Sequence, residues 1–133
     1  MKELRPYLIR FNMFQDARGS LTVAKLLFIP KRVFWIYDVE KGATRSDHAH
    51  TKEEQILVAL AGQFDVNYFA SCGVSGNVKM KCAEEGLYIP RLTWTSLSNF
   101  SRNAVCLVIS STEYNQNDFI KEWKWFEKNI FNK

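Results

Sequence analysis

Short β-like segments separated by turn signals follow one another along this chain at intervals of roughly ten residues. Many of them are rich in β-branched and aromatic residues, and Phe64–Tyr68 and Val78–Cys82 alternate between apolar and polar positions. Such alternation places one face of a strand against a core and the other toward solvent. The pattern therefore predicts an all-β protein, either a sandwich or a closed barrel.

We predict strands at residues 7–11, 21–27, 33–37, 64–68, 78–82, 86–89 and 104–109, with one more around Trp94. A long strand is expected to begin at His48 and to continue through residues 56–60, and residues 74–77 are expected to form a hairpin tip. From Asp118 onward, apolar residues recur at three- and four-residue steps with Lys and Glu between them. This spacing predicts a C-terminal amphipathic α-helix that either covers the barrel or contacts another subunit.

Composition narrows the class of protein. The 133 residues fit one domain spanning residues 1–133, and 47% hydrophobic residues suffice for a packed core. Lys and Arg exceed Asp and Glu by only 18 to 14, without a long basic run, so we expect no nucleic-acid binding. No stretch approaches the ~20 apolar residues of a membrane span, and the three cysteines show no CxxC spacing. We therefore expect a cytoplasmic protein that does not bind membranes.

His48 and His50 are the only two histidines of the chain. In an extended strand, residues two apart lie on the same face. Imidazole titrates near pH ~6.5, which suits it to general acid/base catalysis and to metal binding. Two passive surface histidines are the simpler alternative. Paired polar rings inside a barrel would cost stability unless they were hydrogen-bonded, and a working site tolerates that cost more readily.

Around the histidines the sequence runs Gly42, five residues, His48-Ala-His50, three residues, Glu54, and later Gly62. This spacing resembles the first motif of cupins, whose fold is a double-stranded β-helix, also called a jelly-roll barrel. In metal-binding cupins, the two histidines and the glutamate are ligands, and a histidine of a second motif is the fourth. The nearest counterpart of that histidine here is Thr95. We therefore expect no metal ion, although two histidines, a carboxylate and water remain an alternative ligand set.

A wider resemblance is carried by Asp16-x-Arg18-Gly19-x-Leu21, Ile29-Pro30-Lys31-Arg32-Val33, Ile36-Tyr37, His48-Ala49-His50, Glu54-Gln55, Trp94, Phe100-Ser101, Ala104 to Val108, Tyr114 and Asp118-Phe119-Ile120. In this order these residues resemble the sugar-nucleotide 3,4-ketoisomerases, which act on dTDP-4-keto-6-deoxyglucose. Two positions depart from the family pattern. The family often has glycine where this chain has Ser46, and it commonly has a basic residue directly after His-x-His, where this chain has Thr51 and then Lys52.

The resemblance implies a cofactor-free isomerisation that moves a ketone from C4 to C3 of the sugar through an enediol. We expect His48 to move the carbon-bound proton and His50 to act near the oxygens, although the order could be reversed. Tyr37 and Arg45 would stabilise the developing oxyanion or phosphate charge. A buried strand tyrosine and a solvated loop arginine are the alternatives for these two residues.

The predicted substrate-binding residues are Arg18, Arg32, Lys52, Gln55 and Trp94. The basic ones are candidates for the pyrophosphate, and Trp94 would either line the sugar pocket or fill the barrel. By analogy with the family we expect a homodimer, with an exchange of N-terminal strands, that serves 3-amino-3,6-dideoxyhexose synthesis for bacterial surface glycans. A 3,5-epimerase, a metal-dependent cupin oxygenase and a non-catalytic sugar-nucleotide-binding module remain alternatives. Both the gluco and the galacto configuration at C4 of the product remain open.

Overall fold

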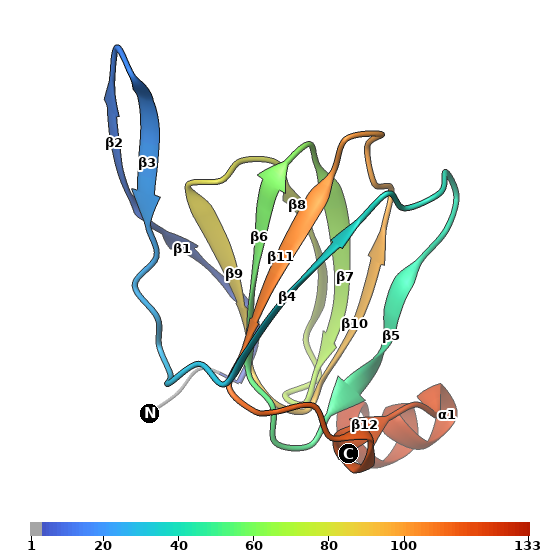
Figure 1. The fold of residues 1–133 in the computed structure, drawn as a ribbon. Coiled ribbons are helices and arrows are strands. Elements are labelled where there is room, and N and C mark those ends of the chain that lie inside the picture. The colour runs from blue at the N-terminus through green and yellow to red at the C-terminus, as the bar shows by residue number, and fades with distance from the viewer. Residues whose placement is uncertain (1–3) are drawn as a thin grey trace.

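The computed structural model describes residues 4–133, and most of its regular structure is β (Figure 1). The strands are β1 (Tyr7–Arg10), β2 (Asn12–Asp16), β3 (Gly19–Val23), β4 (Arg32–Tyr37), β5 (Arg45–His50), β6 (Gln55–Ala61), β7 (Phe64–Ala70), β8 (Ser75–Met80), β9 (Glu85–Ile89), β10 (Thr93–Ser98), β11 (Val105–Ser110) and β12 (Phe119–Ile120). Three short helical segments complete it: η1 (Gln116–Asp118), α1 (Trp123–Phe126) and the π-helical η2 (Glu127–Phe131).

Two five-stranded sheets face each other, in the orders β1-β9-β6-β11-β4 and β12-β5-β10-β7-β8. From β4 to β11 the chain passes repeatedly from one sheet to the other, as in a double-stranded β-helix (Figure 1). Apolar side chains from both sheets form the main core, including Leu57, Phe64, Val66, Leu87 and Val108. The predicted all-β jelly-roll barrel is confirmed.

The predicted single strand from His48 to residue 60 is wrong. β5 ends at His50 and β6 begins at Gln55, and the two strands belong to different sheets. Four polar residues, Thr51 to Glu54, separate them and carry the chain across. The predicted hairpin tip is also displaced, because the turn lies at Ala70–Val74, where the Ala70 amide donates to the Val74 carbonyl and β8 begins one residue later.

An N-terminal hairpin was only partly predicted. β3 is shorter than the expected 21–27 strand, and it pairs with β2, which the sequence did not indicate. The turn between them leads into Gly19, the first residue of β3, whose φ of 127° lies in the region that favours glycine. This β2–β3 hairpin projects away from the barrel, whereas β1 pairs with β9 inside the first sheet (Figure 1).

The C-terminal helix is shorter than predicted. Phe119 and Ile120 do not begin a helix; they pair as β12 with His50 and Ala49 of β5. The helix begins at Trp123, and its Phe126 packs against Trp94 and Ala49. The aromatic stripe thus covers the outside of the second sheet and fixes the short strand beside the histidines. No helix among residues 4–133 is long and apolar enough to cross a membrane.

Candidate active site

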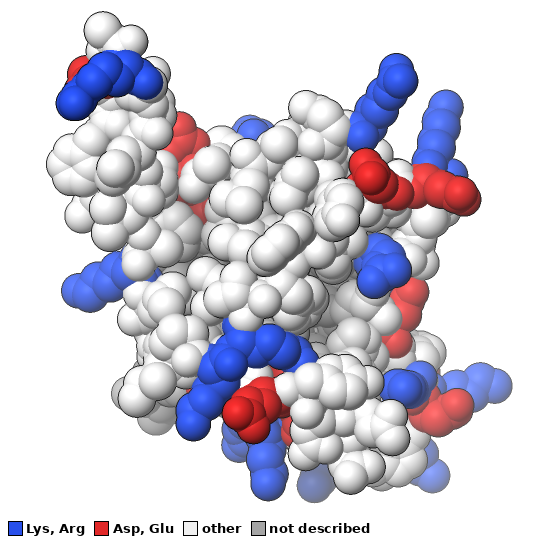
Figure 2. Space-filling view, in the orientation of Figure 1, with Lys and Arg blue, Asp and Glu red and all other residues white. Residues whose placement is uncertain are grey.

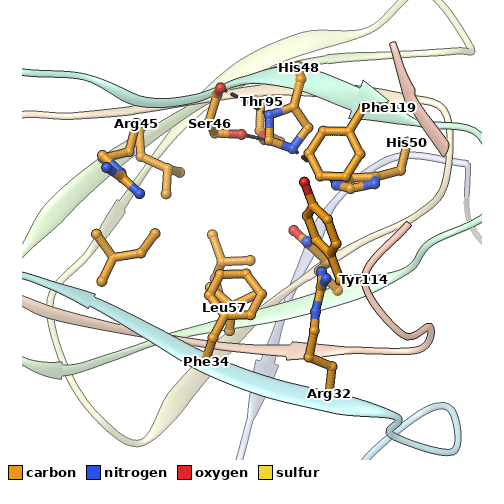
Figure 3. A pocket seen from close by; sticks show the side chains of 14 residues that line it. Arg32, Phe34, Arg45, Ser46, His48, His50, Leu57, Thr95, Tyr114 and Phe119 are labelled. Atoms are coloured by element: carbon orange, nitrogen blue, oxygen red, sulfur yellow. Dashed lines mark hydrogen bonds between the residues drawn. The ribbon is translucent and has the colours of Figure 1, made fainter. Parts of the chain in front are cut away.

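A cavity of about 410 Å³ opens between the two sheets at the histidine strand (Figure 3). Its lining is mostly apolar, with a few convergent polar side chains, as in small-molecule sites. The lining residues are Arg32, Phe34, Ile36, Arg45, Ser46, His48, His50, Gln55, Leu57, Thr95, Leu97, Val108, Tyr114 and Phe119.

A β-bulge shapes the histidine side of the cavity. In the pairing of β5 with β10, Thr95 lies opposite His48 and Ser96 lies opposite Ser46, so Asp47 is the extra residue. Ser46 and Asp47 both have positive φ, at 78° and 58°. Bulges re-aim side chains, and here the result is that Arg45, Ser46 and His48 all line the same cavity.

The two histidine rings are in direct contact. The Nε2 atoms of His48 and His50 lie 3.0 Å apart, and the rings are nearly perpendicular, with an interplanar angle of 80°. Phe119 packs against both, with ring centroids 4.5 Å from His48 and 4.4 Å from His50 (Figure 3). His48 is half-buried, whereas His50 is buried behind it. The predicted pair is therefore assembled on one cavity wall.

The outer nitrogens of the pair face different partners. His48 Nδ1 lies 2.9 Å from the carbonyl oxygen of Ser46, which can only accept, so this nitrogen carries a proton. His50 Nδ1 lies 3.3 Å from Asp118 Oδ2 and 3.7 Å from Glu53 Oε1, without the alignment of a hydrogen bond to either. Both carboxylates are buried. A proton on His50 Nδ1 would face two negative groups, which favours its presence there.

These contacts show where protons on the pair would lie. The 3.0 Å contact between the two Nε2 atoms is a hydrogen bond and therefore needs one proton between them. A neutral His48 already carries its proton on Nδ1, so in that state the shared proton belongs to His50 Nε2. A proton on His50 Nδ1 would be the third, and it would make His50 an imidazolium. In that state, the charges of His50 and Arg32 would balance those of Glu53 and Asp118.

Burial is the main reason why the pKa of each histidine is lowered. At His48 the Ser46 carbonyl opposes the effect of burial, and at His50 Glu53 and then Asp118 oppose it. Each ring therefore releases an extra proton more readily than free imidazole does, and the two carboxylates weaken this effect at His50 without reversing it. An imidazole poised in this way is suited to proton transfer.

Glu53 is held by a ring of donors. Arg32 Nη2 lies 3.0 Å from Glu53 Oε2, the hydroxyl groups of Ser110 and Thr112 donate at 2.9 and 2.8 Å, and the Gln55 amide donates as well. Arg32 also lies over the rings of Phe34 and Tyr114, at 5.0 and 5.5 Å. The guanidinium is thus part of the wall that supports His50.

The donor set around His50 fits a metal ion poorly. Ligand atoms of His50, Glu53 and Asp118 lie within 4.8 Å of one another, but the oxygens of Glu53 already accept four side-chain donors, including the Arg32 cation. The cupin set also fails to form, because Glu54 does not line the cavity and instead accepts a hydrogen bond from the Tyr88 hydroxyl. The pocket residues suit a proton better than a divalent cation.

Among the other predicted site residues, Arg45, Arg32 and Gln55 line the cavity. Arg45 lies across the cavity from Arg32 and Tyr114 (Figure 3), and it is an exposed cation at the start of β5. Arg32 and Gln55 are engaged with Glu53, so their placement favours a supporting role over direct contact with a pyrophosphate.

The structure corrects the placement of four predicted residues. Strand alternation turns Tyr37 and Trp94 away from the cavity: Tyr37 is 58% exposed on the outer face, and Trp94 is buried against α1. Arg18 lies in the β2–β3 turn, with its side chain 91% exposed and paired with Asp16. Lys52 is exposed in the turn after β5 and borders a separate, smaller hollow. These four residues do not reach the cavity of their own chain.

Four residues of the site were not predicted as such: Glu53, Asp118, Phe119 and Tyr114. Asp118 and Phe119 were expected in a helix, where their side chains would not have been assigned to the histidine strand. The alternation of charged and apolar residues around Asp118 gave no sign of the short strand β12. Glu53 stood beside Glu54, and only the strand break at residues 51–54 shows which of the two turns inward.

Comparison with known proteins shows the family of this chain. Residues 5–130 match the FdtA family, described as WxcM-like, C-terminal. The chain is 32% identical over 126 residues to TDP-4-oxo-6-deoxy-alpha-D-glucose-3,4-oxoisomerase of Aneurinibacillus thermoaerophilus, covering 92% of this chain and 90% of the relative. The chain belongs to this family. The resemblance read from the sequence is confirmed.

Solved structures of similar family members superpose over almost the whole chain. A histidine-to-asparagine variant of the 3,4-ketoisomerase QdtA of Thermoanaerobacterium thermosaccharolyticum, in complex with TDP-4-keto-6-deoxyglucose, is 26% identical, with a TM-score of 0.91 and coverage of 99% and 98% of the two chains. A 3,4-ketoisomerase of Helicobacter canadensis is 28% identical, with a TM-score of 0.88 and coverage of 95% and 97%. The FdtA-family barrel of this chain is therefore that of an isomerase.

Proposed function

We propose that this protein is a TDP-sugar 3,4-ketoisomerase that converts dTDP-4-keto-6-deoxyglucose into a dTDP-3-keto-6-deoxyhexose. The observation that carries the proposal is the His48–His50 pair, whose Nε2 atoms lie 3.0 Å apart at the wall of an apolar cavity. The reaction needs two proton-transfer groups next to neighbouring carbons, and this pair supplies them. The activity of the similar A. thermoaerophilus protein supports the assignment.

In the first step, the substrate replaces the contact between the two rings. His48 Nε2 removes the proton from C3, which the C4 carbonyl acidifies, while His50 Nε2–H donates its proton to the C4 oxygen. The product of the step is an enediol across C3 and C4. His48 has gained one proton and His50 has lost one, so the charge of the pair is unchanged.

In the second step, the proton transfers are reversed at the neighbouring atoms. His48 returns its proton to C4, and the hydroxyl on C3 gives its proton back to His50 as the C3 ketone forms. Both rings end as they began, and the oxidation state of the sugar as a whole does not change. The cycle therefore needs no redox cofactor. Arg45, the exposed cation of the cavity, is placed to stabilise negative charge on the enediol or the phosphates.

We further propose that the chain acts as one domain over residues 1–133, of which residues 1–3 lie outside the described part, and works in the cytoplasm. Cys72, Cys82 and Cys106 are free thiols, as expected in a reducing compartment. The C3 ketone of the product is the group that a subsequent amination would consume, which suits 3-amino-3,6-dideoxyhexose synthesis for surface glycans.

A homodimer is part of the proposal, and it is supported by exposed apolar surface. Met13, Phe14, Leu21 and Val23 of the β2–β3 hairpin are exposed, as are residues of the outer face of the first sheet such as Trp35. Figure 2 shows a broad uncharged area over this sheet and the hairpin, with charged side chains toward its edges. An apolar surface of this kind marks a protein–protein contact. A second copy of the chain fits it, because the hairpin of one copy and the sheet face of the other are both apolar and could bury each other.

The deciding experiment supplies dTDP-4-keto-6-deoxyglucose in deuterated water and follows C3 and C4 by NMR. We expect a ketone at C3, with deuterium at C4 wherever the proton on His48 exchanges with solvent before it is returned, and the same spectra give the configuration at C4. Label at C5 without movement of the carbonyl would instead indicate an epimerase, and unchanged substrate would indicate a binding module.

Histidine variants test the roles within the reaction. His48→Asn and His50→Asn should each lower kcat by roughly 10²- to 10⁴-fold, because each removes one proton-transfer group. Circular dichroism and thermal unfolding verify that the variants are folded. Full activity in both variants would contradict the mechanism even if the wild-type protein produced the C3 ketone.

A further inference from the structure

Asp118 is the carboxylate nearest to His50, and it comes from the other end of the chain. It lies in η1, directly before β12, and is 7% exposed. Its oxygens accept from the Thr51 hydroxyl and from the amides of Lys52 and Glu53, the latter two at 2.9 and 3.2 Å. Burial would raise the pKa of Asp118, but these donors outweigh it and lower the pKa. Asp118 is therefore a fixed and ionised carboxylate.

We propose that Asp118 is a positioning residue of the isomerase: its carboxylate keeps a proton on Nδ1 of His50 in both protonation states of the ring, so that only the Nε2 proton is exchanged with the sugar oxygens. The proposal rests on the proposed function, since it names the group that sets the tautomer of the proposed oxygen-side acid. It assigns no contact between Asp118 and substrate.

The surroundings of His50 single out Asp118 from the other charged groups. His48 faces the Nε2 side, Phe119 covers the ring, and Glu53, Asp118 and Arg32 are the charged groups near Nδ1. Glu53 is 3.7 Å away and already shares its charge with Arg32. In the described part of the chain, the one ion-pair partner of Asp118 is His50. Among titratable side chains in these residues, the imidazole is therefore the group on which the charge of Asp118 acts most directly.

The two tautomers of a neutral His50 are not equivalent at this site. With its proton on Nε2, the ring would place the Nδ1 lone pair beside Asp118 Oδ2, 3.3 Å away. With its proton on Nδ1, the ring places N–H against that carboxylate and leaves Nε2 free to take a proton back from the substrate. The second form is the one that the mechanism needs after His50 has donated to the C4 oxygen.

Removal of the charge has a predictable sign. Asp118 favours the protonated ring, so its loss lowers the pKa of His50 further. His50 must be protonated to donate, so activity falls as the pH rises through that pKa. In an Asp118→Asn variant, the alkaline limb of the kcat–pH profile should therefore move to lower pH, and kcat near neutral pH should fall by roughly 10²-fold, the usual contribution of one acid/base group. A purely structural role would lower kcat without moving the limb.

Matched variants separate charge from shape. Asp118→Glu keeps the charge and should keep the wild-type position of the alkaline limb, whatever its effect on kcat. Glu113→Gln removes a carboxylate from the loop before η1. The Glu113 side chain borders the separate hollow and does not line the cavity. It should leave both kcat and the pH profile unchanged.

Ring ¹⁵N NMR gives a readout that does not depend on turnover. Because the chain has only two histidines, protein without an affinity tag yields two ring spin systems, and His50→Asn assigns them. In the wild type, neutral His50 should be the Nδ1–H tautomer; in Asp118→Asn it should shift toward Nε2–H and titrate at lower pH.

A wild-type His50 that is Nε2–H when neutral would overturn the proposal, and this result needs no variant to fold. So would an unchanged ring titration and an unchanged alkaline limb in Asp118→Asn. If instead the wild type formed no C3 ketone while its tautomer was as expected, the proposed function would fail and the positioning of His50 by Asp118 would stand.

Discussion

At the scale of single residues, Ser46 has a backbone conformation that suits glycine better than any other residue. Its φ of 78° is in the left-handed region, where a non-glycine residue costs about 1–3 kcal/mol. This backbone conformation would favour the glycine that the sequence resemblance leads us to expect at this position. Here the hydroxyl gains a contact with Thr95, with the two oxygens 2.7 Å apart, and this contact offsets part of the strain.

Two substitutions at Ser46 separate strain from the hydroxyl contact. Ser46→Ala loses only the contact, whereas Ser46→Gly loses the contact and relieves the strain. We expect the glycine variant to exceed the alanine variant in free energy of unfolding by about 1 kcal/mol, measured by urea denaturation. Ser96, which lies opposite in β10, is the control: there glycine should be less stable than alanine. The same order at both positions would argue against a strained Ser46.

At the scale of elements, the C-terminal segment links stability to the site. Phe126 is 0% exposed and packs with Trp94 and Ala49, and through α1 it anchors β12 against the histidine strand. Phe126→Ala should lower the free energy of unfolding by about 3–5 kcal/mol. Its neighbour Trp125 is 52% exposed. Trp125→Ala should change the free energy of unfolding by less than about 0.5 kcal/mol.

Thermal and urea unfolding measure both variants, and hydrogen exchange locates the effect. The amides of β12 and β5 should lose protection in Phe126→Ala before those of β6 and β11, because only the former depend on this anchor. Equal losses across the two sheets, or equal effects of the two substitutions, would show that the C-terminal segment is not a separate support for the site.

Sequence periodicity predicted the elements whose pattern is set by the barrel core. The strand around Phe64–Tyr68 was found because its alternation reflects burial on one face, and the strand around 33–37 because its residues are β-branched and aromatic. Sequence periodicity could not reveal β12, because a strand of two residues is too short to show a period. Phe119 and Ile120 also fit the spacing of the helix that follows. The same limit hid Asp118, whose role depends on a contact 68 positions from His50 in the sequence.

The site followed the same division. His48 and His50 were recognisable because a single strand carries both, and their spacing alone places them on one face. Trp94 and Tyr37 matched the family by sequence, but the direction of a side chain depends on register, and strand alternation turns them outward. Residues that depend on one element were predictable, and those that depend on how two elements meet were not.

At the scale of the whole molecule, the projecting hairpin and the uncharged sheet face carry the proposal of a dimer. Phe14 and Leu21 lie opposite each other in the β2–β3 register and are 61% and 59% exposed. In an isolated chain these side chains contact mainly water, so replacing them by glutamate would cost little stability. In a dimer that buries them, the same replacement would place unpaired charge in an apolar contact.

The double variant Phe14→Glu/Leu21→Glu therefore tests assembly directly. In analytical ultracentrifugation, we expect the wild type to have twice the 15.5 kDa mass of one chain. The double variant should have the mass of a single chain and a thermal unfolding midpoint similar to that of the wild type. Trp125→Glu introduces a charge at a comparably exposed aromatic residue of the C-terminal helix, and it should remain dimeric. A wild type that sediments as one chain at micromolar concentration, or a double variant that stays dimeric, would contradict this role for the hairpin. Since Arg18 lies at the hairpin turn, loss of activity in a folded, monomeric double variant would also indicate that the hairpin supplies residues to the partner's cavity.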